Sequence, residues 1–243
     1  MNPSTKKTML AAVMNVSTKK TMLAAVMIVA LVATAAQATT IQSIMDGGGS
    51  VTVGHFTFSD FTVQATAIGG VSPLADLIDI DISVGEDGGV TLSFHGAWSA
   101  GPLDWSVITS NISYKVSVDE EFIAETSDMA AISSSLLGDA FYLMNVGVFD
   151  GDPADPDSEL MAEHLLQEGL GEDVTGDSQE FENPLQEFYV NMGLYLRTEE
   201  DGAMVVLSEF AQTFGGTAVT TPEPTALALL AMGGAGICLK RFR

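Results

Sequence analysis

Leu77-Ile-Asp-Ile-Asp-Ile-Ser-Val84 is the stretch that decides the fold class. Its three isoleucines alternate with polar residues, so an extended chain here would have one apolar and one polar face. This period of two predicts a half-buried β-strand over 77–84. The residues that follow, Glu86-Asp87-Gly88-Gly89, are typical of a hairpin connection to a second strand over 90–94.

The rest of the middle of the chain repeats this kind of pattern. Segments rich in Thr, Ser, Val, Ile and Phe are separated by Gly, Asp and Pro, as in proteins built from short antiparallel strands. The other expected strands are 51–58, 61–67, 105–118, 122–126, 140–149, 187–197 and 203–214. We therefore expect a mainly β fold, an antiparallel β-sandwich of jelly-roll-like kind, with one or two short helices.

Two segments are predicted to be helical. The first follows a cap at Asp157 or Ser158, ends at Gly169 or Gly171, and has an apolar stripe made of Leu160, Met161, Leu165 and Leu166. The second and weaker one covers 127–137 behind a cap at Asp128.

Two connections are also predicted. The acidic, glycine-containing stretch 169–183 is expected to be a mobile loop. Glu200-Asp201-Gly202 is expected to be a second hairpin that joins the last two strands.

Charge is distributed very unevenly along the chain, which has 9 Lys and Arg, 32 Asp and Glu, and a formal net charge of -23. Between residues 39 and 221 only Lys115 and Arg197 are basic, against 31 of the 32 acidic residues, so this body carries -29. Nucleic acid would repel it, because phosphates are bound by cations. Divalent cations, basic partners or high salt are compatible with it, and so is a plain solubility role. The single cysteine, Cys238, lies outside the body, which excludes disulfides and thiolate chemistry within it.

The N-terminus has the organisation of a secretion signal. Residues 1–13 and 14–26 are a tandem duplication that differs at one position, so Met14 is an alternative start. A lysine pair precedes an apolar stretch, and Ala36-Gln37-Ala38 is an A-x-A site for signal peptidase. We therefore predict a signal peptide over 1–38 that is removed after export by the secretion machinery. A retained transmembrane helix is the alternative.

The C-terminus has three parts, which are Pro222-Glu223-Pro224, an apolar stretch over 226–239, and a basic end with Lys240, Arg241 and Arg243. As a helix, 225–239 would be about 22 Å long, which is short of the ~30 Å hydrocarbon core. Basic side chains that reach toward the lipid head groups would close part of this gap and stay cytoplasmic. We therefore predict a short C-terminal transmembrane helix with the body outside.

This tail resembles the PEP-CTERM sorting signal of Gram-negative bacteria. The matching residues are Pro222, Glu223, Pro224, Gly233, Gly234, Gly236, Lys240, Arg241 and Arg243, and Phe242 departs from the pattern. The resemblance implies cleavage by an exosortase-type membrane protease, transient anchoring in the inner membrane, and final residence at the outer surface or in a biofilm beside exopolysaccharide. It implies no activity for the body. An ordinary membrane anchor is the alternative.

The densest carboxylate cluster of the body consists of Asp150, Asp152, Asp155 and Asp157. Hard oxygen ligands at such spacing favour Ca²⁺. Ala154 and Met161 stand where an EF-hand needs ligands, so the alternative is an acidic, proline-bent loop that leads into a helix cap.

Trp98 and Trp105 lie on either side of a turn. Aromatic faces beside carboxylates can hold sugars by stacking and hydrogen bonding, which makes these two residues the predicted glycan-binding pair. Burial in the core at a strand end is the alternative.

The histidines His55, His95 and His164 show no spacing typical of a metal site. His164 is expected at the surface of the predicted helix. A Ser-His-Asp triad built from distant residues stays open, but no G-x-S-x-G motif is present, so no catalytic residue is assigned.

The sequence thus predicts three parts: a signal peptide over 1–38, an acidic extracellular β-rich body over 39–221, and a sorting segment over 222–243. The leading hypothesis is an exported structural or adhesive surface protein that is not an enzyme and lies beside exopolysaccharide, with anionic polymer bridged through divalent cations. A carbohydrate- or Ca²⁺-binding module is the first alternative and a secreted hydrolase the second. No cofactor other than Ca²⁺ is expected.

Overall fold

The computed structural model describes residues 39–103 and 105–219. The predicted signal peptide and C-terminal sorting segment lie outside the described residues, and so do Ala36, Ala38, the Pro222-Glu223-Pro224 motif and the terminal basic cluster. Within the described ranges, no helix combines the length and the apolar character that crossing a membrane requires.

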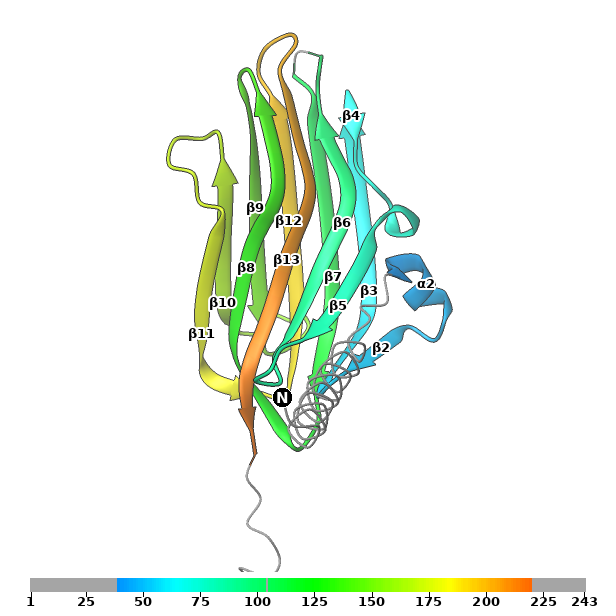
Figure 1. The fold of residues 1–243 in the computed structure, drawn as a ribbon, viewed down its shortest axis with the longest axis vertical. Helices are drawn as coiled ribbons and strands as arrows, with labels where there is room; N and C mark the ends of the chain where they lie inside the picture. Colours follow the sequence, from blue (N-terminus) through cyan, green and yellow to red (C-terminus); the bar gives the residue numbers. More distant parts are fainter. Residues whose placement is uncertain (1–38, 104, 220–243) are drawn as a thin grey trace, which may run out of the picture. The chain divides into compact units, whose positions relative to one another are not determined.

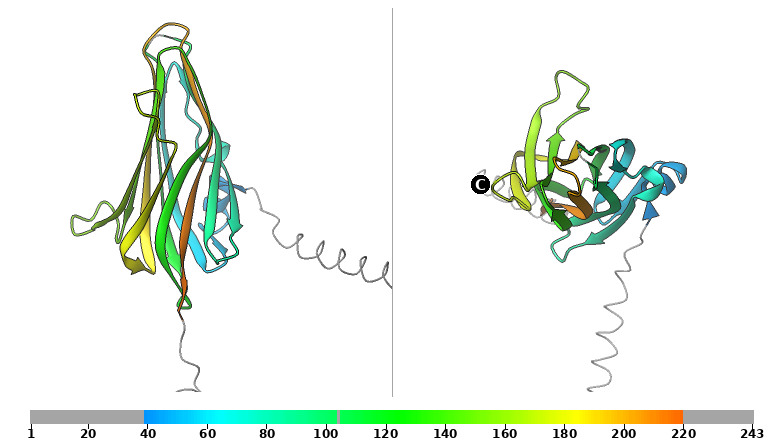
Figure 2. Two further views of the ribbon diagram at one scale, coloured as in Figure 1. Left: turned by 60° about the vertical axis from the view of Figure 1, so that its left-hand side comes forward. Right: turned by 90° about the horizontal axis from the view of Figure 1, so that it is seen from above.

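Two antiparallel sheets face each other in the body (Figures 1 and 2). The first sheet has the order β1-β5-β6-β13-β8-β11, and β4 also pairs with β6. Its strands are β1 (Thr39–Thr40), β4 (Gly70–Val71), β5 (Asp79–Val84), β6 (Val90–Ala100), β8 (Phe122–Leu137), β11 (Gly176–Leu185) and β13 (Met204–Ala218).

The second sheet has the order β10-β9-β12-β7-β3-β2. Its strands are β2 (Ser50–Val53), β3 (Phe56–Ile68), β7 (Val107–Val118), β9 (Ala140–Phe149), β10 (Leu160–Glu168) and β12 (Glu187–Thr198). The predicted mainly β, antiparallel sandwich is therefore confirmed.

The connectivity is that of a jelly roll. From β6 onward the chain crosses from one sheet to the other at every connection except the one between β9 and β10. The result is two sets of four neighbours, β6-β13-β8-β11 and β7-β12-β9-β10, which wind around each other as two Greek keys.

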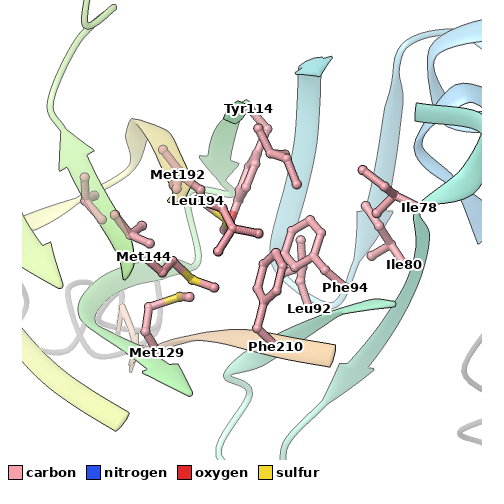
Figure 3. Close-up of a cluster of buried hydrophobic side chains, with 14 of the residues drawn as sticks. Ile78, Ile80, Leu92, Phe94, Tyr114, Met129, Met144, Met192, Leu194 and Phe210 are labelled. Carbon is pink, nitrogen blue, oxygen red and sulfur yellow. The ribbon is translucent and has the colours of Figure 1, made fainter. Parts of the chain in front are cut away.

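The core fills the space between the two sheets, as Figure 3 shows. Met144 and Met192 of the second sheet meet Met129 and Phe210 of the first, and all four are buried. The alternation in 77–84 is confirmed, since the isoleucines of this stretch are buried and Asp79 is exposed. Full burial of a side chain of this size stabilises the fold by about 1.5–3 kcal/mol.

Both predicted turns form, but only one of them is a hairpin. Glu86-Asp87-Gly88-Gly89 joins the paired strands β5 and β6, with Gly88 at a φ of 86°. Glu200-Asp201-Gly202 joins β12 to β13, and these strands belong to opposite sheets. The hairpin prediction for this second turn was wrong because a tight turn can also connect two packed layers.

Both helix predictions were wrong. The segment 158–169 contains β10, in which Ala162, His164 and Leu166 point inward and Glu163 and Leu165 outward. The apolar residues of this segment fit a period of 3.6 as well as a period of two, and a polar histidine at an inward position hides the alternation. The second predicted helix, 127–137, is the latter part of β8.

The helices that do form are elsewhere. A short helix, α2 (Ile41–Asp46), begins at Thr40, whose side chain accepts a hydrogen bond from the Ser43 amide at 3.0 Å. A single 3-10 turn, η1 (Ala75–Leu77), precedes β5. The stretch 169–183, predicted to be a mobile loop, contains most of β11.

One end of the sandwich gathers three connections, those between β6 and β7, β8 and β9, and β12 and β13 (upper end of Figure 1). Hydrogen bonds tie them together, since the Gly202 amide donates to Pro102 O at 2.8 Å and the Glu199 amide to Asp139 O at 2.8 Å. We call this the loop end. β13 starts there and reaches its last residue, Ala218, at the opposite end.

Candidate functional site

The outer face of the second sheet presents polar, uncharged side chains in register. Strands β3, β7, β12 and β9 lie next to one another, and their outward residues form rows that cross the sheet. Three successive rows are Thr62–Ser113–Asn191–Gly147, Gln64–Asn111–Gly193–Asn145 and Thr66–Thr109–Tyr195–Leu143. Period-two alternation puts all of these side chains on the face away from the core.

Two hollows lie over these rows. The first, about 530 Å³, is bounded by β3, β7 and β12 and by the loop residues 152–154. The second, about 390 Å³, is bounded by β3, β7, β12 and β9. Gln64 and Asn111 line both hollows, so the two are adjacent, and we call them together the outer groove.

The floor of the outer groove is open because of Gly193. A Cβ atom added there would meet only the Asn145 carbonyl oxygen, at 3.8 Å. Beside it, no donor among the described residues reaches the buried Oδ1 of Asn191. The floor therefore combines free space at Gly193 with a buried acceptor that has no partner in the described part of the chain, and a ligand hydroxyl could pair with this acceptor only after the Asn191 side chain had turned toward the groove.

Two tyrosines bound the groove along β12. Tyr189 lines the first hollow, and the Lys115 Nζ lies 5.6 Å from its ring centroid. Lys115 also contacts Glu187 at 2.9 Å, and this hydrogen bond raises the pKa of the lysine. Tyr195 lines the second hollow, and its ring centroid is 5.9 Å from that of Phe141.

The charges at the groove are negative. Asp60 and Asp152 supply carboxylates to the lining of the first hollow, and no Lys or Arg of the described ranges lines either hollow. The nearest cation described above is Lys115, beside Tyr189.

The predicted Ca²⁺ cluster is used within its own loop. Asp150 accepts from the Glu159 amide at 2.7 Å, Asp152 from the Ala154 amide at 2.9 Å, and Asp155 from the Asp157 amide at 3.0 Å. The structure brings Asp152 to the groove wall but does not gather the four carboxylates. Over residues 39–103 and 105–219, no group of three or more His, Cys, Asp or Glu is placed to hold a metal ion. Calcium binding stays a prediction.

The two predicted glycan-binding tryptophans have opposite environments. Trp98 is fully buried against Phe210, with ring centroids 5.2 Å apart, so it cannot stack on a sugar and this part of the prediction was wrong. Trp105 is 58% exposed, and the Arg197 guanidinium carbon lies 4.3 Å from its ring centroid.

His164 is a core residue and not the surface residue that the helix prediction implied. It is fully buried on β10, where burial lowers its pKa. Its Nδ1 lies 3.1 Å from Asp177 Oδ2, and its Nε2 lies 3.0 Å from Ser127 Oγ. These are the contacts of a Ser-His-Asp triad, assembled from β8, β10 and β11.

This triad-like arrangement is closed. Ser127 is fully buried, and the Gln212 Nε2 donates to its Oγ at 3.1 Å. Gln212 in turn accepts a hydrogen bond from the Tyr114 hydroxyl, whose pKa is raised by burial. The residues therefore form a buried polar network that joins the two sheets.

The sequence holds a weak signal for the outer groove. Neutral polar residues recur with a period of two in three separate strands, in a body otherwise rich in carboxylates. The network around His164 has no such signal, since its members come from distant strands.

No protein-family model and no curated protein sequence matches this chain. Among solved structures, the chain is similar to TmCBM61 in complex with β-1,4-galactotriose, with 10% identity, a TM-score of 0.25, and coverage of 62% of this chain and 86% of that one. It is also similar to the family 32 CBM of NanJ from C. perfringens in complex with galactose, with 12% identity, a TM-score of 0.25, and coverage of 63% and 93%.

A third similarity is to the enzymatically active domain of tailspike protein 4 of bacteriophage CBA120. It has 8% identity and a TM-score of 0.26, and it covers 66% of this chain but 20% of that one. At such identities and TM-scores, none of these structures assigns a ligand or a binding residue to this chain.

Proposed function

We propose that the body is a non-catalytic carbohydrate-binding module that holds an uncharged glycan in the outer groove. The observation that carries this proposal is the pair of adjacent hollows over β3, β7, β12 and β9, lined by amides, hydroxyls and two tyrosines. Sugars are held by such groups, because amides and hydroxyls pair with ring hydroxyls while tyrosine rings cover apolar sugar faces. A rigid sheet keeps these groups in place without a ligand.

The ligand should be uncharged because of the electrostatics of the body. Asp60 and Asp152 lie at the groove, and the body between 39 and 221 carries a formal charge of -29. A polyuronate or another polyanion would meet repulsion at the site and in the surrounding field. A neutral polysaccharide would not.

This proposal names an interaction, binding of a neutral glycan, that would account for the predicted adhesive role. The leading sequence hypothesis was a structural or adhesive surface protein, with sugar binding as an alternative. A groove that binds a neutral polymer would make the protein adhesive by binding glycan, with no need for divalent cations to bridge anionic chains.

The export route is a further part of the proposal and rests on the sequence pattern. Signal peptidase would cut after Ala38, and an exosortase-type protease would act at Pro222-Glu223-Pro224. The module would then reside at the outer surface beside exopolysaccharide. Mass spectrometry of the exported protein tests this directly, since intact ends at both termini would contradict it.

Filling the groove floor should weaken binding and leave the fold intact. Gly193→Val puts a branched side chain into open space on a strand, so affinity for neutral polysaccharide should fall about tenfold or more. Asn191→Ala should weaken binding without loss of stability, because it removes an acceptor that has no partner among the described residues. Affinity electrophoresis of the exported chain in neutral polysaccharide gels measures both.

Gly176→Val is the matched control for this experiment. Gly176 also lies in a strand, its added Cβ would meet only the Met129 carbonyl oxygen at 3.6 Å, and it belongs to the other sheet. The control should bind like the wild type. Equal retention of Gly193→Val and Gly176→Val would contradict a ligand in the outer groove.

A further inference from the structure

The outward face of β12 continues beyond the outer groove. After Tyr189, Asn191, Gly193 and Tyr195, the next outward residue is Arg197, which is paired in register with Val107 and Phe141. From Tyr189 to Arg197 the strand extends about 26 Å at ~3.3 Å per residue. A ligand that follows the groove along β12 would therefore reach Arg197 at the loop end.

Arg197 supports an exposed aromatic ring at this point. Its guanidinium carbon lies 4.3 Å from the Trp105 ring centroid, and its Nη2 contacts Glu199 Oε1 at 3.2 Å. Trp105 keeps 58% of its surface exposed. One part of the ring is thus covered by a fixed cation while much of the rest faces solvent, with a guanidinium and a carboxylate beside it.

The backbone presents Trp105 in a fixed position. Its φ of 58° lies in the left-handed region, which is uncommon for a bulky residue. The flanking loop is bonded to the end of β12, because the buried Thr198 hydroxyl donates to Leu103 O at 2.9 Å and accepts from the Ser106 amide at 3.2 Å. Thr198 thus ties Leu103 and Ser106, on either side of Trp105, to the end of β12, and an anchor of this kind lowers the entropic cost of binding.

We propose that Trp105 is the stacking platform at the far end of the same binding site, and that the ligand is a linear neutral polysaccharide bound along β12. This inference rests on the proposed function of the outer groove. The inference adds that the site binds several consecutive sugar residues of a polysaccharide and not a single terminal sugar. Stacking on Trp105 would contribute only when the glycan is long enough to span the distance from the groove.

The test uses neutral oligosaccharides of graded length, prepared by partial hydrolysis of the neutral extracellular polysaccharide of the producing cells. Titration calorimetry with the exported chain should show affinity that rises with length and then levels off. Trp105→Ala should lower affinity about two- to tenfold for the long oligomers and leave the short ones unchanged, because stacking of this kind is worth about 0.5–1.5 kcal/mol.

Leu103→Ala is the control, since Leu103 is 59% exposed in the same loop and should affect no oligomer. If Trp105→Ala changed no affinity while Gly193→Val abolished binding, the extended site would be refuted and the groove retained. If Leu103→Ala and Trp105→Ala lost affinity equally, the loop end would be a general apolar contact surface, and the platform would be refuted. If no oligomer of any length bound, both proposals would fall.

Discussion

A single buried histidine, His164, is the central member of the hydrogen-bond network that joins the two sheets. His164 joins Asp177 to Ser127, and through Gln212 the chain of hydrogen bonds reaches Tyr114. Every link is satisfied when the imidazole is neutral, with Nδ1 donating to the carboxylate and Nε2 accepting from the serine hydroxyl. A satisfied network of this kind specifies one packing of the two sheets, because breaking any link leaves a polar group unpaired in the core.

Protonation of His164 should destabilise the fold. Burial lowers the pKa of His164, while Asp177 and Asp128, the carboxylates that face it, oppose this shift. The unfolded chain therefore takes up this proton at its usual pKa of about 6.5, before the folded chain does. The free energy of unfolding should fall as pH drops below about 6.5 and should be fully retained above it.

Urea denaturation of wild type and His164→Gln between pH 7.5 and 5.5 tests this sign. The variant should be less stable at pH 7.5, because a link of the network is lost, but it should show a smaller decline toward pH 5.5. Equal pH dependence in the two proteins would mean that His164 is not the group responsible.

At the scale of elements, strand prediction succeeded where alternation was clean and failed where a polar residue pointed inward. The stretch 77–84 has isoleucine at each inward position and was predicted well. β10 has histidine at its central inward position, which hides the alternation, and the outward Leu165 falls in the apolar stripe that predicted a helix. β11 is rich in carboxylates because it is an edge strand with little apolar surface to bury, so its composition resembles a loop.

Adjacent leucines on β10 separate the strand from the predicted helix. Leu166 is fully buried and Leu165 is 47% exposed, whereas a helical stripe would bury both. Leu166→Ala should cost about 2–5 kcal/mol of unfolding free energy. Leu165→Ala should change it by no more than about 0.5 kcal/mol. Chemical denaturation of the two variants measures this, and similar large losses in both would contradict the strand.

The candidate site was out of reach of sequence reasoning for a reason of geometry. The period-two pattern tells which side chains share a face of one strand, but register and strand order decide which strands lie together. Gln64, Asn111 and Asn145 are neighbours only because β3, β7, β12 and β9 pair in that order. The sequence proposed Trp98 and Trp105 as equal candidates for glycan binding, and only the structure shows that Trp98 is buried and Trp105 exposed.

For the molecule as a whole, the large excess of carboxylates over basic side chains is the dominant electrostatic property. The two basic residues of the body are both engaged with carboxylates, Lys115 with Glu187 and Arg197 with Glu199. The remaining carboxylates repel one another in the folded state, where they are closer together than in the unfolded chain. Screening should relieve this repulsion.

Added salt should therefore raise the melting temperature. Calorimetric scans between about 10 mM and 0.5 M NaCl should show a steady increase in melting temperature. Matched scans in CaCl₂ and MgCl₂ at equal ionic strength separate general divalent screening from the predicted calcium site. A larger increase with CaCl₂ than with MgCl₂ would support the predicted calcium site in the Asp150–Asp157 loop, and equal increases would count against it.

The course of β13 has a consequence for the proposed carbohydrate-binding module, if it is tethered at its C-terminal end. This strand starts at the loop end and finishes at Ala218 at the opposite end of the sandwich, about 45 Å away at ~3.3 Å per residue. A tether attached beyond Ala218 would hold the body at the end opposite the loop end and leave Trp105 far from the attachment point. A polysaccharide bound along β12 would then extend away from the tethered end, so one polysaccharide chain could bind several neighbouring copies of the protein.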